Sequence, residues 1–265
     1  MKDLYSINPD YFKHLLIRTP LEKPLKNIKT VLSRRKRSKH PELHEIHIES
    51  QRVEQFLERI LNKSSNCIDI GCHLGSMLSE IMRLSPDGKH MAFEPVPYKA
   101  RWLKQKFPEI HIQEIGLSDK PGEATFYINT SRSGFSGLRQ HNSKKGENID
   151  KITIRCETLD NVLSPDYRVD FIKIDVEGGE LAVLRGAVNT LVRHHPILLF
   201  ECTRSGLSSF GFTADEIFEF LTGDNSYSIF LIKDFMADNK PLNFEQFNTA
   251  LQYPFQAFNF IAQAR

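Results

Sequence analysis

Several common sequence features are missing from this chain, and each absence excludes a class of protein. No apolar run approaches the roughly 18 residues that a membrane-spanning helix needs, and the opening stretch lacks the apolar core of a signal peptide. The four cysteines show no CxxC spacing, which favours reduced thiols over a disulfide framework. The formal net charge is only +2, so no broad surface field for nucleic acid is predicted. We therefore expect a soluble cytoplasmic protein without a transmembrane segment or a nucleic-acid partner.

Two nucleotide-binding fingerprints are also absent, although a glycine-spaced loop, DIGCHLG, runs from Asp69 to Gly75. A dinucleotide fingerprint needs GxGxxG, whereas His73 holds the place of the second glycine and Ser76 that of the third. The P-loop signature GxxxxGKS/T does not occur at this loop, so no triphosphate cradle is predicted. NAD and FAD are therefore disfavoured as ligands.

The same loop suits a carrier without phosphates. The preceding residues are typical of a buried strand, Gly71 and Gly75 allow tight turns close to a ligand, and a helical pattern begins at Ser76. S-adenosylmethionine carries a sulfonium and an ammonium that Asp69 could accommodate, and a ribose diol that needs a second carboxylate. Glu94 supplies one, about 20 residues further on, where dinucleotide folds place their ribose-binding acid. The alternative is a tight turn followed by a solvated glutamate.

Length and composition predict one large α/β domain with an appended arm. The chain has 265 residues, of which 40% are hydrophobic. Residues 1–50 combine short helical patterns, repeated prolines and the basic run Arg34 to Arg37, so we expect a basic helical arm there. That run could contact anionic lipid at a membrane periphery or a phosphate-bearing carrier, although a solvated charge cluster is the favoured interpretation. Residues 51–265 then form the main domain, beginning with an amphipathic helix from Val53 to Leu61.

Strands and helices alternate from Asn66 onward, which predicts a mainly parallel sheet. The expected strands are Cys67–Ile70, His90–Phe93, His111–Ile115, Phe171–Ile174, Ile197–Phe200, Ser226–Ile232 and Phe258–Ala262. Two further β-rich segments, 124–128 and 152–156, flank a long polar loop. We interpret that loop as a mobile lid, because connections of this length usually carry function or are disordered.

A second group of chemical residues follows the fourth expected strand, in IKIDVEGGE from Ile172 to Glu180. Asp175 ends the strand, Glu177 follows in a glycine turn, and both should lie at the carboxyl edge of the sheet, where ligands of open α/β folds bind. Lys173 lies two residues before Asp175 and therefore on the same face. It needs a partner, which Asp175 or a substrate oxygen could provide. The alternative interpretation is a structural ion pair together with a helix N-terminus capped by Glu177.

A third carboxylate, Glu201, ends the apolar run from Pro196 to Phe200. If its strand neighbours the one that ends at Asp175, the two acids could act as a base and its electrostatic partner. The pair could also hold a divalent metal. Because no dense ligand cluster accompanies the pair, we assign no metal residues.

Several motifs together resemble one known family. In order, the chain contains DIGCHLGS, AFEPVPYKARWLKQ, GLSDKPGEATFY, ETLDNVL, DFIKIDVEGGELAVLRGA and ILLFEC, between Asn66 and Cys202. This series resembles the FkbM family of S-adenosylmethionine-dependent methyltransferases. The resemblance implies a class I methyltransferase, or Rossmann-like, fold with helices on both faces of a seven-stranded sheet of order 3-2-1-4-5-7-6 and an antiparallel last strand. It implies cofactor contacts from the following residues: Asp69, Gly71, His73, Gly75, Ser76, Glu94, Pro95, Leu117, Ser118, Asp119 and Asp175. Cys72 and His73 depart from the small residues that the family tends to show there.

The resemblance implies O-methylation of a hydroxyl on a sugar, a glycan or another natural-product acceptor, and an anionic or lipid-linked acceptor would suit the basic arm. We interpret Asp175 as the group that orients or deprotonates the acceptor hydroxyl, with Lys173 and Glu201 as electrostatic partners and Glu177 as a secondary contact. The alternative function is a scaffold that binds S-adenosylmethionine or a partner without catalysis. Failure to bind S-adenosylmethionine or its demethylated product would contradict the interpretation as an enzyme.

Overall fold

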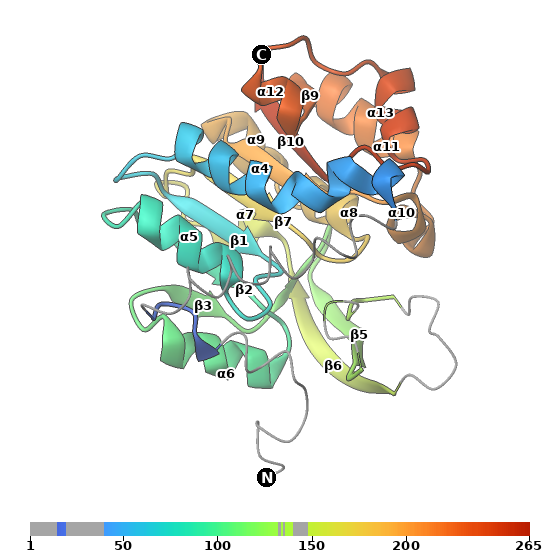
Figure 1. Ribbon diagram of the computed structural model, residues 1–265. Coiled ribbons are helices and arrows are strands. Elements are labelled where there is room, and N and C mark those ends of the chain that lie inside the picture. Colours follow the sequence, from blue (N-terminus) through green and yellow to red (C-terminus); the bar gives the residue numbers. More distant parts are fainter. Residues whose placement is uncertain (1–14, 20–39, 132–133, 135, 140–147) are drawn as a thin grey trace.

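The computed structural model describes residues 15–19, 40–131, 134, 136–139 and 148–265, and contains a seven-stranded sheet of order β3-β2-β1-β7-β8-β10-β9. The strands are β1 Cys67–Ile70, β2 Met91–Phe93, β3 His111–Gln113, β7 Phe171–Ile174, β8 Ile197–Glu201, β9 Tyr227–Leu231 and β10 Asn259–Ala264. Numbered within this sheet alone, β7 to β10 are its fourth to seventh strands, so the order is 3-2-1-4-5-7-6. The last strand, β10, runs antiparallel to both of its neighbours. The predicted class I methyltransferase fold is confirmed (Figure 1).

The central strands are short apolar runs that are buried on both faces, which is why the sequence predicts them well. All four residues of β1 and all four of β7 are buried, and both strands have the predicted bounds. The third predicted strand, His111–Ile115, is shorter than expected. It ends at Gln113, because the chain then leaves the main sheet to enter a second one.

The second sheet has three strands in the order β4-β6-β5. Its strands are β4 Gly116–Leu117, β5 Gly122–Asn129 and β6 Ile149–Glu157, and the antiparallel pair β5 and β6 extends away from the main sheet (Figure 1). The polar loop that we interpret as a lid joins β5 to β6. Most of its middle, including residues 140–147, lies outside the described residues.

One face of the main sheet is covered by helix α4, His44–Ile60, together with α5, Ser76–Leu84, and α12, Ile232–Met236. Phe56 and Leu57 of α4 pack on Cys67, Phe171 and strand residues beyond them, which gives the amphipathic helix its buried face. The expected boundary at residue 50 falls inside α4. A short 3₁₀ turn, η2 Pro41–Leu43, precedes this helix, and the basic run at residues 34–37 lies outside the described residues.

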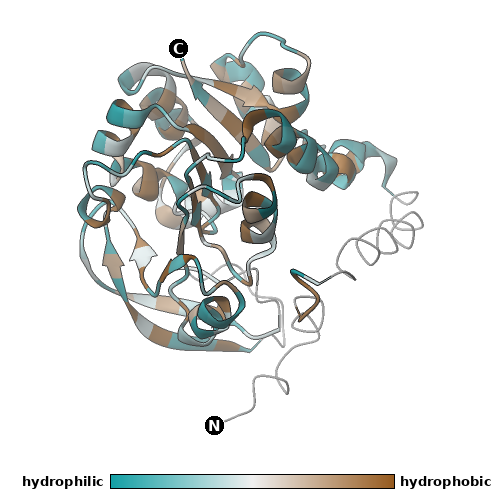
Figure 2. Ribbon diagram, turned by 90° about the vertical axis from the view of Figure 1, so that its left-hand side faces the viewer, coloured by the Kyte–Doolittle hydropathy of each residue, from teal (hydrophilic) through white to brown (hydrophobic). Residues whose placement is uncertain are grey.

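The opposite face is covered by helices from the second half of the chain, which enclose the larger apolar core. The elements packed around this core are α7 Leu159–Val162, α8 Glu180–Arg185, α9 Val188–His194, α10 Arg204–Phe210, α11 Ala214–Glu219, the π-helical turn η4 Phe220–Asp224 and α13 Phe244–Ala250. Helix α6, Pro97–Lys106, instead flanks β2 and β3. Figure 2 shows hydrophobic residues gathered on the strands and hydrophilic residues on the outer faces of the helices. None of the helices in the described ranges is both long and apolar enough to cross a membrane.

Candidate active site

Strand register brings the predicted charged residues together at the carboxyl edge of the sheet. Asp69 of β1 pairs directly with Lys173 of β7, and Lys173 pairs with Leu199 of β8, so Asp175 and Glu201 follow on the same face. The Lys173 Nζ lies 3.0 Å from the Asp175 Oδ2 and 3.7 Å from the Asp69 Oδ1. Asp175 is therefore the partner that the buried lysine needs.

The ion pair between Lys173 and Asp175 shifts the pKa values of both groups so that both stay charged. Burial opposes ionisation of Lys173, but the carboxylates of Asp175 and Asp69 outweigh it and raise the pKa of the lysine. Burial would raise the pKa of Asp175, yet the Lys173 ammonium and a hydrogen bond with Glu201 bring it below its usual value. Asp69 is 0% exposed, and burial raises its pKa to about 6. Neither Asp69 oxygen has a hydrogen-bond partner in the described part of the chain. The nearby Lys173 ammonium is therefore the group that stabilises the ionised form of Asp69.

The glycine loop has two different structural tasks. Gly71 has a φ of +76°, and a Cβ there would lie 1.8 Å from the carbonyl oxygen of Asp175, so only glycine fits between the two strand ends. Gly75 has a φ of +87°, and its Cβ would collide with the ring of Phe107. Gly71 therefore shapes the cavity edge, whereas Gly75 allows the start of α5 to pack on α6.

Glu94, at the end of β2, is buried and held by the loop that follows β1. Its Oε2 accepts a hydrogen bond of 2.9 Å from the His73 N–H, and its Oε1 accepts one of 3.0 Å from the Val96 N–H. Burial raises the pKa of Glu94, although Lys99 and both N–H donors oppose this. The carboxyl group is thus fixed in orientation while keeping lone pairs for a ligand.

A cavity of about 260 Å³ lies beside Glu94 and Gly71. Eight of the predicted residues line it: Gly71, His73, Glu94, Pro95, Leu117, Ser118, Asp175 and Glu177. The other four predicted cofactor residues do not line it: Asp69 is fully buried, Gly75 packs against Phe107, and Ser76 and Asp119 are exposed. The cavity thus collects residues from the ends of β1 and β2, from β4 and from the turn that follows β7.

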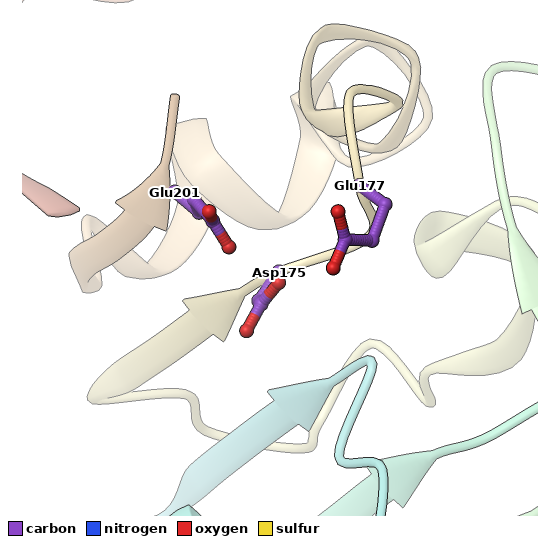
Figure 3. Close-up of side chains that lie close together, drawn as sticks. All are labelled: Asp175, Glu177 and Glu201. Carbon is purple, nitrogen blue, oxygen red and sulfur yellow. The ribbon is translucent and has the colours of Figure 1, made fainter. Parts of the chain in front are cut away.

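Asp175, Glu177 and Glu201 form an acidic cluster, in which one carboxylate oxygen from each residue lies within 4.8 Å of the others (Figure 3). Burial, and then the charge of Asp175, raise the pKa of Glu177 to about 8 and that of Glu201 to about 11. Glu201 therefore holds a proton at neutral pH and shares it with Asp175. The cluster has the dimensions of a divalent-metal site, but acidic groups gather in many proteins without metal, and we assign none.

Two buried charged residues of this region, Glu180 and Lys99, are not predicted from the sequence. Glu180, not Glu177, caps the turn after β7, because its Oε1 accepts hydrogen bonds of 3.1 Å from the N–H groups of Val176 and Gly178. Lys99 of α6 is 3% exposed and lines the cavity, and burial lowers its pKa although Glu94 opposes that effect. Glu180 could have been found from its place at the helix start. Lys99 carries no local signal, since lysines on helices are usually solvated.

A second cavity, of about 700 Å³, lies on the other side of the acidic cluster. Glu201 lines it, and Glu177 lines both cavities. Its wall comes from the start of α10 and from residues 251–258. Thr203, Arg204 and Ser205, which follow Glu201 closely in the sequence, line this cavity.

Comparisons with known proteins agree with the fold. Residues 69–229 match the methyltransferase FkbM domain. The chain is 27% identical to the 2-O-methyltransferase NoeI of Sinorhizobium fredii, over 54% of this chain and 66% of NoeI. It is also 27% identical to the AMB antimetabolite synthetase AmbE of Pseudomonas aeruginosa, over 48% of this chain and 8% of AmbE. It therefore spans less than two thirds of either relative.

Among solved structures, an FkbM methyltransferase from Methylobacillus flagellatus KT superposes with a TM-score of 0.49 at 14% identity, covering 77% of this chain and 44% of that one. The domain match extends over more than half of the chain and includes the end of β1 and all of β2, β7 and β8. The chain therefore belongs to the methyltransferase FkbM domain family.

Proposed function

We propose that this protein is an S-adenosylmethionine-dependent methyltransferase that methylates a hydroxyl group on a sugar, a glycan or another natural product. One observation carries the proposal: a cavity built around Gly71 and Glu94 meets a second cavity at Glu177. A group transfer between two molecules needs adjoining sites with titratable groups at their junction. The name of NoeI, a 2-O-methyltransferase, supports a hydroxyl as the acceptor group.

The first cavity fits the cofactor in shape and charge. Because Gly71 lacks a Cβ, the ends of β1 and β7 approach each other closely at the cavity edge, and the fixed Glu94 carboxyl group suits a ribose diol. Leu117 and Ser118 lie on the lining and suit the adenine end, while Gly71 and His73 suit the methionine end. Among the described residues that line this cavity, Lys99 is the only lysine or arginine, and we assign it to the cofactor carboxylate.

Proton removal is best assigned to Glu177. When bound, S-adenosylmethionine supplies a methyl group that its sulfonium has already activated. The protein must then align the acceptor oxygen with that methyl group and accept the proton of the hydroxyl. Glu177 lines both cavities, and its pKa of about 8 lies close to neutral, where a general base is most effective.

Of the two roles that the sequence leaves open for Asp175, we assign it the orienting one. Its ion pair with Lys173 lowers its pKa, so it stays charged and is a weaker base than Glu177. A charged Asp175 can accept a hydrogen bond from the acceptor hydroxyl without taking its proton. Glu201 supports this role, because its raised pKa keeps it protonated beside Asp175.

The proposal is tested by incubating the protein with a metabolite extract and S-adenosylmethionine that carries an isotopically labelled methyl group. Mass spectrometry should detect a labelled product with the methyl group on oxygen. Calorimetry with S-adenosylhomocysteine measures binding separately. Failure to bind it would overturn the assignment of the cofactor, whereas binding without any labelled product would favour the non-catalytic scaffold. Turnover that stops with EDTA and returns with Mg²⁺ would place a metal at the acidic cluster.

A further inference from the structure

The second cavity has an aromatic wall that lies outside the segment matching the family. Tyr253, Phe255 and Phe258 line the cavity, whereas the family match ends at residue 229. The rings of Tyr253 and Phe255 meet edge to face with centroids 5.8 Å apart, and those of Phe255 and Phe258 lie 5.2 Å apart. The three rings therefore form one continuous surface, which we call the aromatic wall.

The wall is held in place by residues that precede the family match. Glu49 of α4 is buried, and its Oε1 accepts hydrogen bonds from the N–H groups of Phe258, at 2.7 Å, and Asn259, at 3.0 Å. Its Oε2 accepts a third, at 3.0 Å, from the Asn259 side chain. The Tyr253 hydroxyl donates a hydrogen bond of 2.6 Å to Glu42. The wall is thus ordered before any ligand arrives, which reduces the entropy lost on binding.

Hydrogen-bonding groups line the same cavity as the wall. Glu177 and Glu201 supply carboxyl groups at the junction with the first cavity, and Thr203, Ser205 and Gln252 supply hydroxyl and amide groups. A ligand that fits must combine an apolar face with several hydroxyl groups. A pyranose ring has that combination, because its C–H groups can cover an aromatic ring while its hydroxyls bond to carboxyl and amide groups.

The charges of the cavity favour an uncharged ligand. Two glutamates line it, and Arg204 is the only basic residue among the described lining residues. The Arg204 guanidinium is held in position by Asn248, because its Nη2 donates a hydrogen bond of 2.5 Å to the Asn248 Oδ1. Glu201 is protonated, so the charge of an ionised Glu177 offsets that of Arg204, and the lining carries no net charge that would attract an anionic group. A cavity of about 700 Å³ also has room for more than one ring.

We propose that the aromatic wall binds the ring face of an uncharged sugar unit of the acceptor and directs its hydroxyls toward Glu177 and Glu201. Acceptor recognition then depends on residues 42–49 and 251–258, which lie outside the family match. This inference rests on the proposed function, and it replaces the expected anionic acceptor by a neutral one.

Saturation-transfer NMR tests the inference. It is carried out on the full chain in the presence of enough S-adenosylhomocysteine to fill the cofactor site. The probes are methyl glucopyranoside, methyl fucopyranoside, N-acetylglucosamine, chitobiose, glucuronic acid and catechol. We expect signals from the ring C–H protons of at least one neutral sugar. Phe255→Ala should weaken that sugar's binding roughly tenfold, the effect of losing about 1.4 kcal/mol of contact energy. Phe244→Ala removes an aromatic ring of α13 outside the cavity and should leave binding unchanged.

The outcomes separate this inference from the proposed function. A wild-type protein that fails to bind S-adenosylhomocysteine contradicts the proposed function. A protein that binds S-adenosylhomocysteine, but no neutral sugar, contradicts the inference alone. Preference for glucuronic acid would show that the acceptor is anionic, and preference for catechol that it is a planar aromatic molecule. Equal sugar binding by wild type and Phe255→Ala would remove the aromatic wall from the site, provided that both bind S-adenosylhomocysteine equally.

Discussion

The two cavities of this protein differ in how their walls are built. The first takes most of its groups from strand ends and the turns that follow them, such as Gly71, Glu94 and Asp175, all inside the family match. The second takes its aromatic wall from residues 251–258 and depends on Glu49 of α4. Sheet register fixes the first cavity, whereas contacts between distant segments fix the second. This contrast predicts that substitutions on the two sides change different measured quantities.

The largest effect is expected at Glu177, the residue common to both cavities. Glu177→Gln keeps the shape of the side chain but removes the base, so turnover should fall by about 10² to 10⁴ while binding of S-adenosylhomocysteine stays unchanged. Only ionised Glu177 accepts a proton, so wild-type kcat/KM should rise with pH until about 8 and then level off. Initial rates with a labelled methyl donor at several pH values check both points.

Glu219→Gln, an exposed glutamate of α11, is the matched control and should keep full turnover. If Glu177→Gln retains both turnover and the rise with pH, another group removes the proton. Asp175→Asn then becomes the decisive variant. Loss of turnover in that variant with intact binding would restore Asp175 as the base.

The sequence predicts the first cavity better than the second for a physical reason. Strands β1 and β7 are short buried runs, and the acids that end them must lie at one sheet edge once the strands are parallel. The hydrogen bonds that Glu49 accepts from Phe258 and Asn259 join segments about 200 residues apart. A pattern within either segment cannot predict such contacts. Lys99 is missed in the same way, because its burial depends on how α6 packs beside β2 and β3.

On the donor side, Glu94→Gln should weaken binding of S-adenosylhomocysteine roughly 10- to 100-fold, a cost of about 1.4 to 2.7 kcal/mol. An amide has one acceptor oxygen, so either the His73 or the Val96 N–H loses its buried partner, and the ribose loses a carboxylate. Calorimetry measures the change. Glu123→Gln, on the exposed start of β5, is the control, and equal affinities for the two variants would contradict a role for Glu94 in the cofactor site.

Gly71→Ala separates a steric role from a conformational one. The substitution forces a left-handed backbone on alanine, at about 1 kcal/mol or more, and also places a Cβ against the Asp175 carbonyl. Gly211→Ala has a similar φ of +78° but nothing within 4 Å of the added Cβ. Thermal unfolding should show a larger loss for Gly71→Ala, and only that variant should lose affinity for S-adenosylhomocysteine. Equal losses in the two variants would contradict the close approach of the strand ends.

The smallest effect is expected at the edge of the aromatic wall, where Tyr253→Phe removes only the hydroxyl that bonds to Glu42. The ring stays and can still cover a sugar face, but its position is less restricted, so the KM for a neutral sugar acceptor should rise about two- to threefold with kcat unchanged. Tyr167→Phe removes a hydroxyl that donates at the same distance, 2.6 Å, to the Lys89 carbonyl, outside both cavities. It should leave KM unchanged. A fall in kcat for Tyr253→Phe would mean instead that this edge positions the reacting hydroxyl, and the two cavities would then be coupled through the wall as well as through Glu177.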